Sequence, residues 1–303
     1  MRRRSTVRNA IEYGVAAAAL GVLAWAPQPV AAALARTCAR LLDLAIPRLR
    51  RVALRNLELA CPELDRAERT RVARGVFRSV ARVVLAFARF PRIGPHNVHE
   101  WIRYEGLEHY QAAKRRGKGV LFATAHLGNW ELSAYAHALM TEPMHVVVRP
   151  LDNPLIDRLV ERRRAGSGNR IIEKKDFARG ILAALHRNEA VGILIDQNAS
   201  PDHGVFVNFF GIAACASTSF AKLAAHSGAA VIPGFALWRE TEGRYVLHFY
   251  PEVPMSGDAA ADTAALQKKL EAAIREVPDQ WLWIHRRWKT RPPGEGSLYR
   301  SAP

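Results

Sequence analysis

Beyond about residue 100, short apolar runs alternate with stretches of helical length. The apolar runs cover residues 119–125, 144–149, 190–196, 230–238 and 245–250, and the helical stretches cover residues 129–140, 153–166, 176–187, 217–227 and 261–277. Strands separated by crossovers of this length pair in parallel, with the helices covering both faces of the sheet. The sequence therefore predicts an α/β fold with a mostly parallel central sheet flanked by helices. The last two strands, joined through Glu242-Gly243, can pair antiparallel.

The N-terminal region differs in composition, being uncharged and largely apolar over a long run. No residue from Tyr13 to Ala35 is charged, and about 20 apolar residues suffice to cross a bilayer. Pro27 and Pro29 interrupt this run. We favour a membrane-anchoring helix within residues 1–36 over two alternatives, a secretory signal peptide and an ordinary buried helix, because no single cleavage site stands out. Residues 37–303 then form one further domain, with a helical lead-in over residues 37–92.

The chain is strongly basic, with 44 Lys and Arg against 28 Asp and Glu and a net charge of +16. Such an excess suits a polyanionic partner, whether nucleic acid, an anionic membrane surface or a phosphorylated substrate, and it also arises from genome composition. Within residues 48–92, valines recur at helical spacing with arginines between them. This pattern fits both a helix resting on a membrane surface and a core helix with a solvated arginine face.

One segment combines residues suited to acid–base chemistry. In ATAHLGNWELSAYAHAL (residues 123–139), His126 stands where an apolar strand stops, Gly128 permits a sharp turn, and Asn129 is a good helix N-cap before Glu131. Residues five apart face each other only if a turn intervenes. A histidine in such a turn can take the proton of a hydroxyl that attacks a thioester, while a carboxylate on its other ring nitrogen fixes the tautomer. The alternative is a histidine that is merely satisfied at a strand end.

The sequence lacks the motifs of several other catalytic and nucleotide-binding sites. There is no G-x-S-x-G elbow, no GxxxxGK[ST] loop, no GxGxxG after a strand and no HExxH. Cys38, Cys61 and Cys215 form no CxxC pair and no zinc-type cluster. They are interpreted as free thiols, and neither a metal nor an organic cofactor is predicted. His137 lies on the apolar face of its helix and is interpreted as structural.

At the H-x4-E segment, the chain resembles the lysophospholipid/glycerolipid acyltransferase superfamily. The Glu form with Asn-Trp inside it is similar to the lipid A late acyltransferases, the Kdo-lipid A lauroyl and myristoyl transferases. Four further blocks resemble that family in order and spacing: RPLDNPLIDRLVERRRAGSG (149–168), LIDQNAS (194–200), VFVNFFGIAACASTSFAKLAAHSGAAVIPGFALW (205–238) and PDQWLWIHRRWKTRPP (278–293). One departure is Asp196-Gln197, where some members have Asp-His.

The resemblance implies an acyltransferase domain in a bacterial inner-membrane enzyme that faces the cytoplasm. It implies a thioester donor, usually acyl carrier protein, a phosphorylated glycolipid acceptor, and no nucleic-acid partner. His126 would be the general base, and Glu131 would be the carboxylate that orients its imidazole ring. Arg149 and Arg164 would bind substrate phosphate or hold the catalytic region, and Asp196 would support that arginine network. From the residues alone, an Arg149–Asp196 ion pair that is merely structural stays open.

Two alternatives to the lipid A acceptor follow from the same residues. The first is acylation of another bacterial lipid, such as a glycolipid or a lysophospholipid. The second is a nonenzymatic protein that binds anionic lipid or nucleic acid through its arginine-rich helices. His126 discriminates between them, since a binding protein does not depend on this residue.

Overall fold

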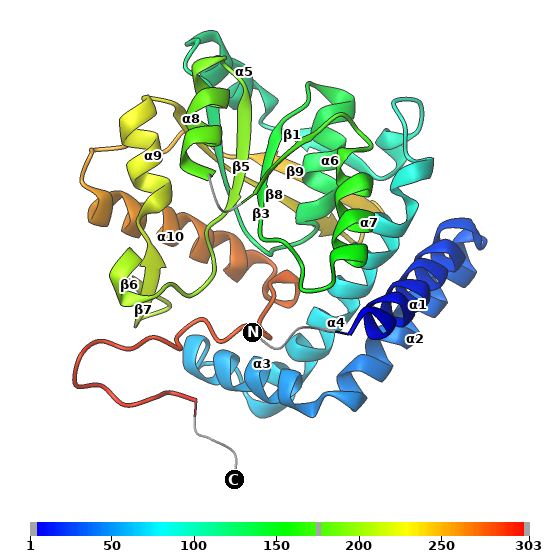
Figure 1. Ribbon diagram of the computed structural model, residues 1–303. Coiled ribbons are helices and arrows are strands. Elements are labelled where there is room, and N and C mark those ends of the chain that lie inside the picture. The colour runs from blue at the N-terminus through cyan, green and yellow to red at the C-terminus, as the bar shows by residue number, and fades with distance from the viewer. Residues whose placement is uncertain (1–4, 174–176, 300–303) are drawn as a thin grey trace.

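The computed structural model describes residues 5–173 and 177–299 and gives ten α-helices and nine β-strands within them (Figure 1). The helices are α1 (Thr6–Trp25), α2 (Gln28–Ala45), α3 (Pro47–Ala60), α4 (Arg66–Arg89), α5 (Leu107–Arg115), α6 (Trp130–Met140), α7 (Pro154–Ala165), α8 (Phe177–His186), α9 (Ser219–Ser227) and α10 (Ala259–Glu276). The strands are β1 (Ile102–Glu105), β2 (Val120–Thr124), β3 (His145–Val148), β4 (Arg170–Glu173), β5 (Ala190–Leu194), β6 (Gly204–Phe209), β7 (Ile212–Ser217), β8 (Ala230–Arg239) and β9 (Arg244–Phe249). Residues 1–4 of the predicted anchor, residue 176 of a predicted helix and residues 300–303 lie outside the described residues.

Seven strands form one sheet in the order β1-β9-β8-β2-β5-β3-β4. Every neighbouring pair is parallel except β8 and β9, which run antiparallel. The predicted α/β class with a mostly parallel sheet is therefore confirmed, as is the antiparallel pair. The sequence analysis did not predict β1, β4 or the separate β6–β7 hairpin. β1 and β4 are four-residue strands at the two edges of the sheet, where burial is incomplete and the apolar signal is weak.

The central strands are continuous apolar runs because helices cover both faces of the sheet. Along β2, Val120 and Phe122 pack into a core that includes α6 residues, while Leu121 and Ala123 pack on the opposite face against α8 and α9. Figure 1 shows α8 and α9 on one side of the sheet and α6 and α7 on the other. The carboxyl ends of β2, β5 and β3, which are neighbours in the sheet, thus open at one shared edge.

The N-terminal helices form an attached layer. Pro27 separates α1 from α2, and the two lie side by side against α4 (Figure 1). Arg89 and Arg92 donate hydrogen bonds to carbonyl groups at the end of α1. α1 is long and apolar enough to cross a membrane, and little of it is buried. Apart from Val84 and Leu151, every large apolar side chain exposed among the described residues lies within residues 7–46.

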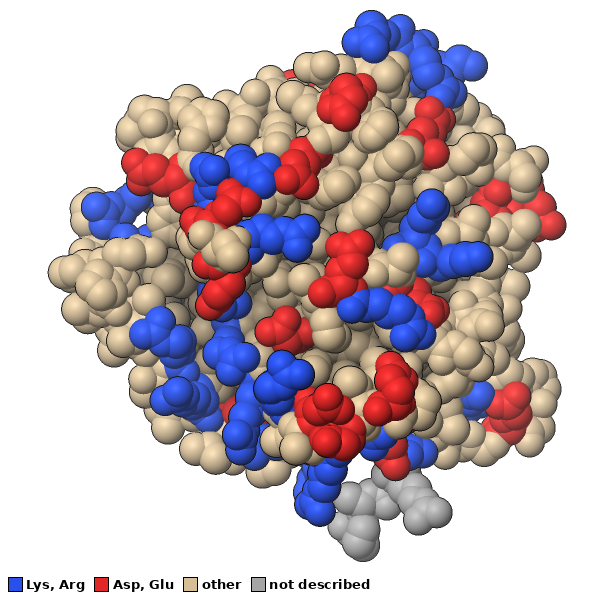
Figure 2. All heavy atoms as spheres, turned by 180° about the vertical axis from the view of Figure 1, so that it is seen from behind, with Lys and Arg blue, Asp and Glu red and all other residues tan. Residues whose placement is uncertain are grey.

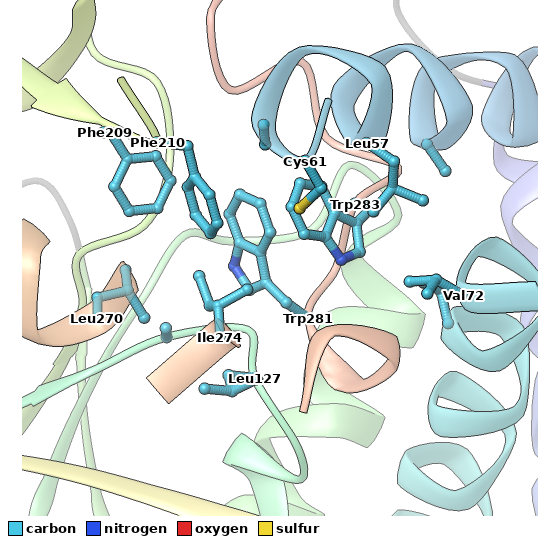
Figure 3. Close-up of a cluster of buried hydrophobic side chains, with 14 of the residues drawn as sticks. Leu57, Cys61, Val72, Leu127, Phe209, Phe210, Leu270, Ile274, Trp281 and Trp283 are labelled. Atoms are coloured by element: carbon cyan, nitrogen blue, oxygen red, sulfur yellow. The ribbon is translucent and has the colours of Figure 1, made fainter. Parts of the chain in front are cut away.

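The predicted lead-in of residues 37–92 is helical, but it begins inside α2 and continues through α3 and α4. A capping box starts α4, in which Asp65 and Glu68 each accept the other's backbone N–H. α3 packs on a core built from distant segments, drawn in Figure 3. Leu57 of α3 and Cys61, which follows that helix, face Trp281 and Trp283, with Phe209 and Phe210 on the other side. Phe209 and Phe210 are both buried. This core fixes the C-terminal segment beneath the strand ends.

Candidate active site

The turn that carries His126 is tightly constrained. β2 ends at Thr124, and Gly128 has a φ of 63°, a region that favours glycine. A Cβ at Gly128 would lie 1.9 Å from the Ala236 carbonyl oxygen, so no other residue fits without moving β8. Asn129 then caps α6 by accepting the Leu132 backbone N–H at 3.0 Å. The predicted strand–turn–helix is therefore present, and it fixes His126 at the carboxyl end of β2.

Asp196 is the hydrogen-bond partner of His126. Thr124 of β2 pairs with Leu194 of β5, so both residues stand two positions beyond the same rung of the parallel ladder. His126 Nδ1 lies 3.0 Å from Asp196 Oδ1, and the His126 backbone N–H donates to Asp196 Oδ2 at 3.0 Å. An ionised carboxylate only accepts hydrogen bonds, so Nδ1 carries the proton. Nε2 is then left for chemistry, because no described residue bonds to it.

The pair is largely desolvated, since the side chains of His126 and Asp196 are 16% and 4% exposed. Burial lowers the pKa of His126, but the charge and hydrogen bond of Asp196, with a smaller contribution from Glu131, more than offset it and leave the pKa raised. Burial likewise opposes ionisation of Asp196, yet His126 and a hydrogen bond from Trp281 hold the pKa of Asp196 below its usual range. The ionised carboxylate thus stabilises an imidazolium at this position.

A third hydrogen bond to Asp196 comes from Trp281. Its indole Nε1–H donates to Asp196 Oδ2 at 2.9 Å, and the ring is 1% exposed within the core of Figure 3. The neighbouring Leu282 N–H donates to the His126 carbonyl oxygen at 3.0 Å. The sequence analysis missed this residue's role. A buried tryptophan needs a hydrogen-bond acceptor for its indole N–H. That need could have suggested a polar partner for Trp281, but the sequence does not say which carboxylate lies within reach.

Glu131 makes a different contact from the one we expected. It accepts two hydrogen bonds from Arg164, from Nε at 2.9 Å and from Nη2 at 2.5 Å, and so links α6 to α7. We expected Glu131 to bond to His126 and Asp196 to serve the arginines. The two carboxylates have exchanged these partners, because Asp196 follows the strand adjacent to β2, whereas Glu131 lies in the first turn of α6 beside α7.

A cavity of about 1150 Å³ opens at this edge of the sheet. Its lining includes His126, Glu131, Arg149 and Arg164, whereas Asp196 lies behind His126 in the wall. Arg149 follows β3 and is exposed, with no hydrogen bond or ion pair to another described residue. His126 and Asp196 therefore meet at this edge of the sheet, while the Arg149–Asp196 ion pair that the sequence left open is not observed.

Charge around the molecule is mixed. Figure 2 shows acidic side chains lying among the basic ones over most of the face seen from behind. Several arginines form ion pairs with glutamates, as in Arg82–Glu240 and Arg103–Glu242. No group of three or more His, Cys, Asp or Glu suited to a metal ion occurs within residues 5–173 and 177–299. The arrangement at His126 places an imidazole bonded to a buried carboxylate beside a cavity that two arginines also line.

The sequence is similar over most of its length to known enzymes. Residues 2–290 match the family described as bacterial lipid A biosynthesis acyltransferase. The chain is 32% identical over 277 residues to the lipid A biosynthesis lauroyltransferase of Escherichia coli K12, covering 90% of each chain. It is 31% identical to the palmitoleoyltransferase of the same strain over 92% of each chain, and 26% identical to the myristoyltransferase over 95% of this chain and 89% of the relative.

The family match spans nearly the whole chain and includes every residue of the site described above. It agrees with the resemblance found from the separate motifs. This chain therefore belongs to the bacterial lipid A biosynthesis acyltransferase family.

Proposed function

We propose that this protein transfers a fatty acyl chain from an acyl thioester, carried by acyl carrier protein, to a hydroxyl of a lipid A precursor. The single observation that carries the proposal is His126, which lines a large cavity while its Nδ1 is held by a buried carboxylate. This arrangement suits a general base acting on a substrate hydroxyl. Membership of the family supports the acyl chemistry and the lipid A acceptor.

In the proposed reaction, His126 Nε2 removes the proton of the acceptor hydroxyl as its oxygen attacks the thioester carbonyl carbon. The tetrahedral intermediate collapses, the C–S bond breaks, and the thiolate takes the proton from His126. An ester and a free thiol result, so atoms and charge balance without an enzyme nucleophile or a cofactor. Asp196 stabilises the transient imidazolium, as the carboxylate of a catalytic triad does.

We assign the arginines to binding and positioning. Arg149 is exposed at the cavity and unpaired among the described residues, which suits a bidentate contact with a phosphate of the acceptor. Arg164 is engaged by Glu131, so its role is to hold α7 against α6 and to keep one wall of the cavity in place. These roles are testable separately, because only Arg149 is available to a substrate without breaking an existing ion pair.

We further propose that α1 and α2, within the predicted anchor of residues 1–36 and just beyond it, attach the protein to the cytoplasmic face of the inner membrane. The exposed apolar side chains concentrated on these helices support this placement. A lipid acceptor would then reach the site without leaving the bilayer. The remaining domain, including the helical lead-in, would carry the chemistry.

The test is acyl transfer by the purified protein and its His126→Ala variant. Labelled acyl carrier protein is the donor, and a Kdo-bearing lipid A precursor, lysophospholipids and other glycolipids are the acceptors. We expect the mass of the lipid A precursor to rise by one acyl chain, at a rate that falls about 10²- to 10⁴-fold in the variant. His186→Ala, at an exposed position on α8, is the matched control.

Two results would contradict the proposal. Transfer only to another lipid would replace the acceptor. Transfer that survives intact in a folded His126→Ala variant would remove the general base. Coenzyme A thioesters, used in parallel, show whether the carrier protein itself is required.

A further inference from the structure

Arg287, in the C-terminal segment, is 0% exposed, less than any other Arg, Lys, Asp or Glu within residues 5–173 and 177–299. It forms no ion pair with another residue in these ranges. Its hydrogen bonds go to two neutral acceptors, from Nη1 to the Cys215 carbonyl oxygen at 2.8 Å and from Nη2 to the Gln267 side-chain oxygen at 3.1 Å. A buried charge without an ion partner is strongly unfavourable, so packing alone does not explain an arginine at this position.

Through Gln267, Arg287 sets the position of the residue before Asp196. A guanidinium only donates hydrogen bonds, so it fixes which end of the Gln267 amide faces it. The amide nitrogen then donates to the Ile195 carbonyl oxygen at 2.8 Å. Gln267 is 1% exposed and has no solvent alternative to these two contacts. Without the guanidinium the amide is free to turn over, which would release the peptide that joins Ile195 to Asp196.

The second contact of Arg287 acts on the far end of the same loop. The Cys215 carbonyl oxygen, on β7, accepts from Arg287 and also from the Ala199 backbone N–H at 3.1 Å. Residues 195 and 199 are therefore each separated from the guanidinium by a single bridging group. Asp196 lies between them, so Arg287 holds the loop that carries this carboxylate on both sides.

Charge supplies a second link between Arg287 and Asp196. Burial lowers the pKa of Arg287 to about 10, and among the charged groups Asp196 opposes this most, so the two feel each other's field without touching. A guanidinium with this pKa is ionised at physiological pH. His285 does not provide such a charge, because its Nε2 accepts the Asn198 backbone N–H at 3.0 Å and burial lowers its pKa.

The other titratable groups that face Arg287 are the Cys215 thiol and the Tyr299 phenol. Burial raises the pKa of both, that of Tyr299 to about 12, so both stay neutral at physiological pH. Asp196 and Arg287 therefore carry opposite buried charges that cancel while His126 is neutral. Loss of the guanidinium would leave the carboxylate uncompensated, and a proton on His126 would then replace the missing charge.

We propose that Arg287 is a positioning residue for the His126–Asp196 pair: it fixes the loop that carries Asp196, and its buried charge balances that carboxylate and favours a neutral His126. This inference rests on the proposed function, in which His126 must be neutral to accept a proton. Glu131 on α6 and His285 in the C-terminal segment also face His126, and both are left unchanged in the test.

The test is a pH titration of His126 by NMR with labelled histidine, in the full-length wild-type protein, Arg287→Met and Arg287→Lys. Methionine keeps much of the length of the side chain and removes the charge, so the pKa of His126 should rise by roughly half a unit or more. Lysine restores the charge, so the pKa should return towards the wild-type value. The acid limb of kcat/KM should move to higher pH in Arg287→Met only, whereas a residue that only packs would move neither quantity.

Two variants of Gln267 separate charge from geometry and remain informative if Arg287→Met does not fold. Gln267→Glu places a carboxylate beside the guanidinium and cancels its charge, so the pKa of His126 should rise as in Arg287→Met. Gln267→Met removes the contact with the Ile195 carbonyl oxygen and leaves the charge in place. In that variant kcat should fall roughly tenfold, with the pKa of His126 nearly unchanged.

Arg89→Met is the matched control. Arg89 is also buried, at 7% exposed, and it donates to a backbone carbonyl, that of Ala26, far from the site in the N-terminal layer. Its loss should lower the melting temperature and leave the titration of His126 unchanged. The inference is overturned if the folded charge variants, Arg287→Met and Gln267→Glu, keep the wild-type pKa of His126, or if Arg89→Met shifts that pKa equally.

The titration keeps the inference distinct from the proposed function, because it needs neither an acyl donor nor an acceptor. If the pKa of His126 shifts as expected in the variants but the wild-type protein transfers no acyl chain, the proposed function fails and the coupling between Arg287 and His126 stands. If the wild-type protein transfers acyl chains while the pKa of His126 ignores both charge variants, the inference fails alone.

Discussion

Two charged pairs border the same cavity, and they are built differently. His126 and Asp196 follow adjacent parallel strands, and Asp196 also accepts the His126 backbone N–H and the Trp281 indole N–H. Glu131 and Arg164 project from two helices, and their side chains are 14% and 24% exposed. The first pair is fixed by the sheet and by a buried core. The second depends on how α7 docks against α6.

This difference indicates which carboxylate sets the orientation and the tautomer of His126. A carboxylate fixed by three hydrogen bonds holds an imidazole in one orientation and one tautomer. A carboxylate already engaged bidentately by an arginine is available to the histidine only through its charge. We therefore assign the orientation of His126 to Asp196 and the integrity of the cavity wall to Glu131 and Arg164.

The largest effect is expected from Asp196→Asn. The amide keeps the size of the side chain but removes the charge and favours the wrong histidine tautomer, so kcat should fall by about 10³- to 10⁴-fold with little change in KM. Steady-state acyl transfer measures this. Asp202→Asn, at a nearby exposed position, is the control. A loss below tenfold would show that Asp196 does not orient the base.

Glu131→Gln and Arg164→Gln should each lower activity by roughly 10- to 100-fold and also lower the melting temperature, because each leaves a partly buried charge unpaired. The double variant should be little worse than either single one, as expected for residues that act through one contact. Activity and thermal unfolding of the four proteins measure this. Glu161→Gln and Arg162→Gln on the exposed face of α7 provide the matched set. Additive losses would place Glu131 and Arg164 in separate roles.

Trp281→Phe should lower kcat about tenfold, since it removes one hydrogen bond to the ionised Asp196 but keeps an aromatic ring in the core. Trp283→Phe is the matched control, because its indole donates to the Pro278 carbonyl oxygen in the same core. Both variants should lose stability. Only Trp281→Phe should change the pH profile of kcat, and identical profiles would reduce Trp281 to a packing residue.

The smallest effect is a shift in pH dependence. The base must be neutral to accept a proton, so activity rises with pH through the pKa of His126. That pKa is raised by Asp196, so the acid limb of kcat/KM should lie above the usual histidine value of about 6.5. In Asp196→Asn the pKa falls, and the limb should move to lower pH. An unmoved limb would mean that another group titrates.

Much of the fold was predictable because the buried strands carry a strong local signal. The apolar run that ends at His126 and the Gly128-Asn129 turn predicted the position of His126 between β2 and α6. The short strands β1 and β4 and the β6–β7 hairpin gave weaker patterns. Partner choice within the site was not predictable, because strand order decides that Asp196 lies beside His126, and a single sequence does not give strand order.

The most direct test of the account is a titration of His126 by NMR with labelled histidine, in the wild-type protein, Asp196→Asn and Glu131→Gln, with His126→Gln used to assign the signal. We predict a pKa raised above the usual histidine value in the wild-type protein. It should drop in Asp196→Asn and change much less in Glu131→Gln, and the Nδ1–H tautomer should be lost only in Asp196→Asn. A pKa that drops in Glu131→Gln and stays unchanged in Asp196→Asn would contradict the account and return the orienting role to Glu131.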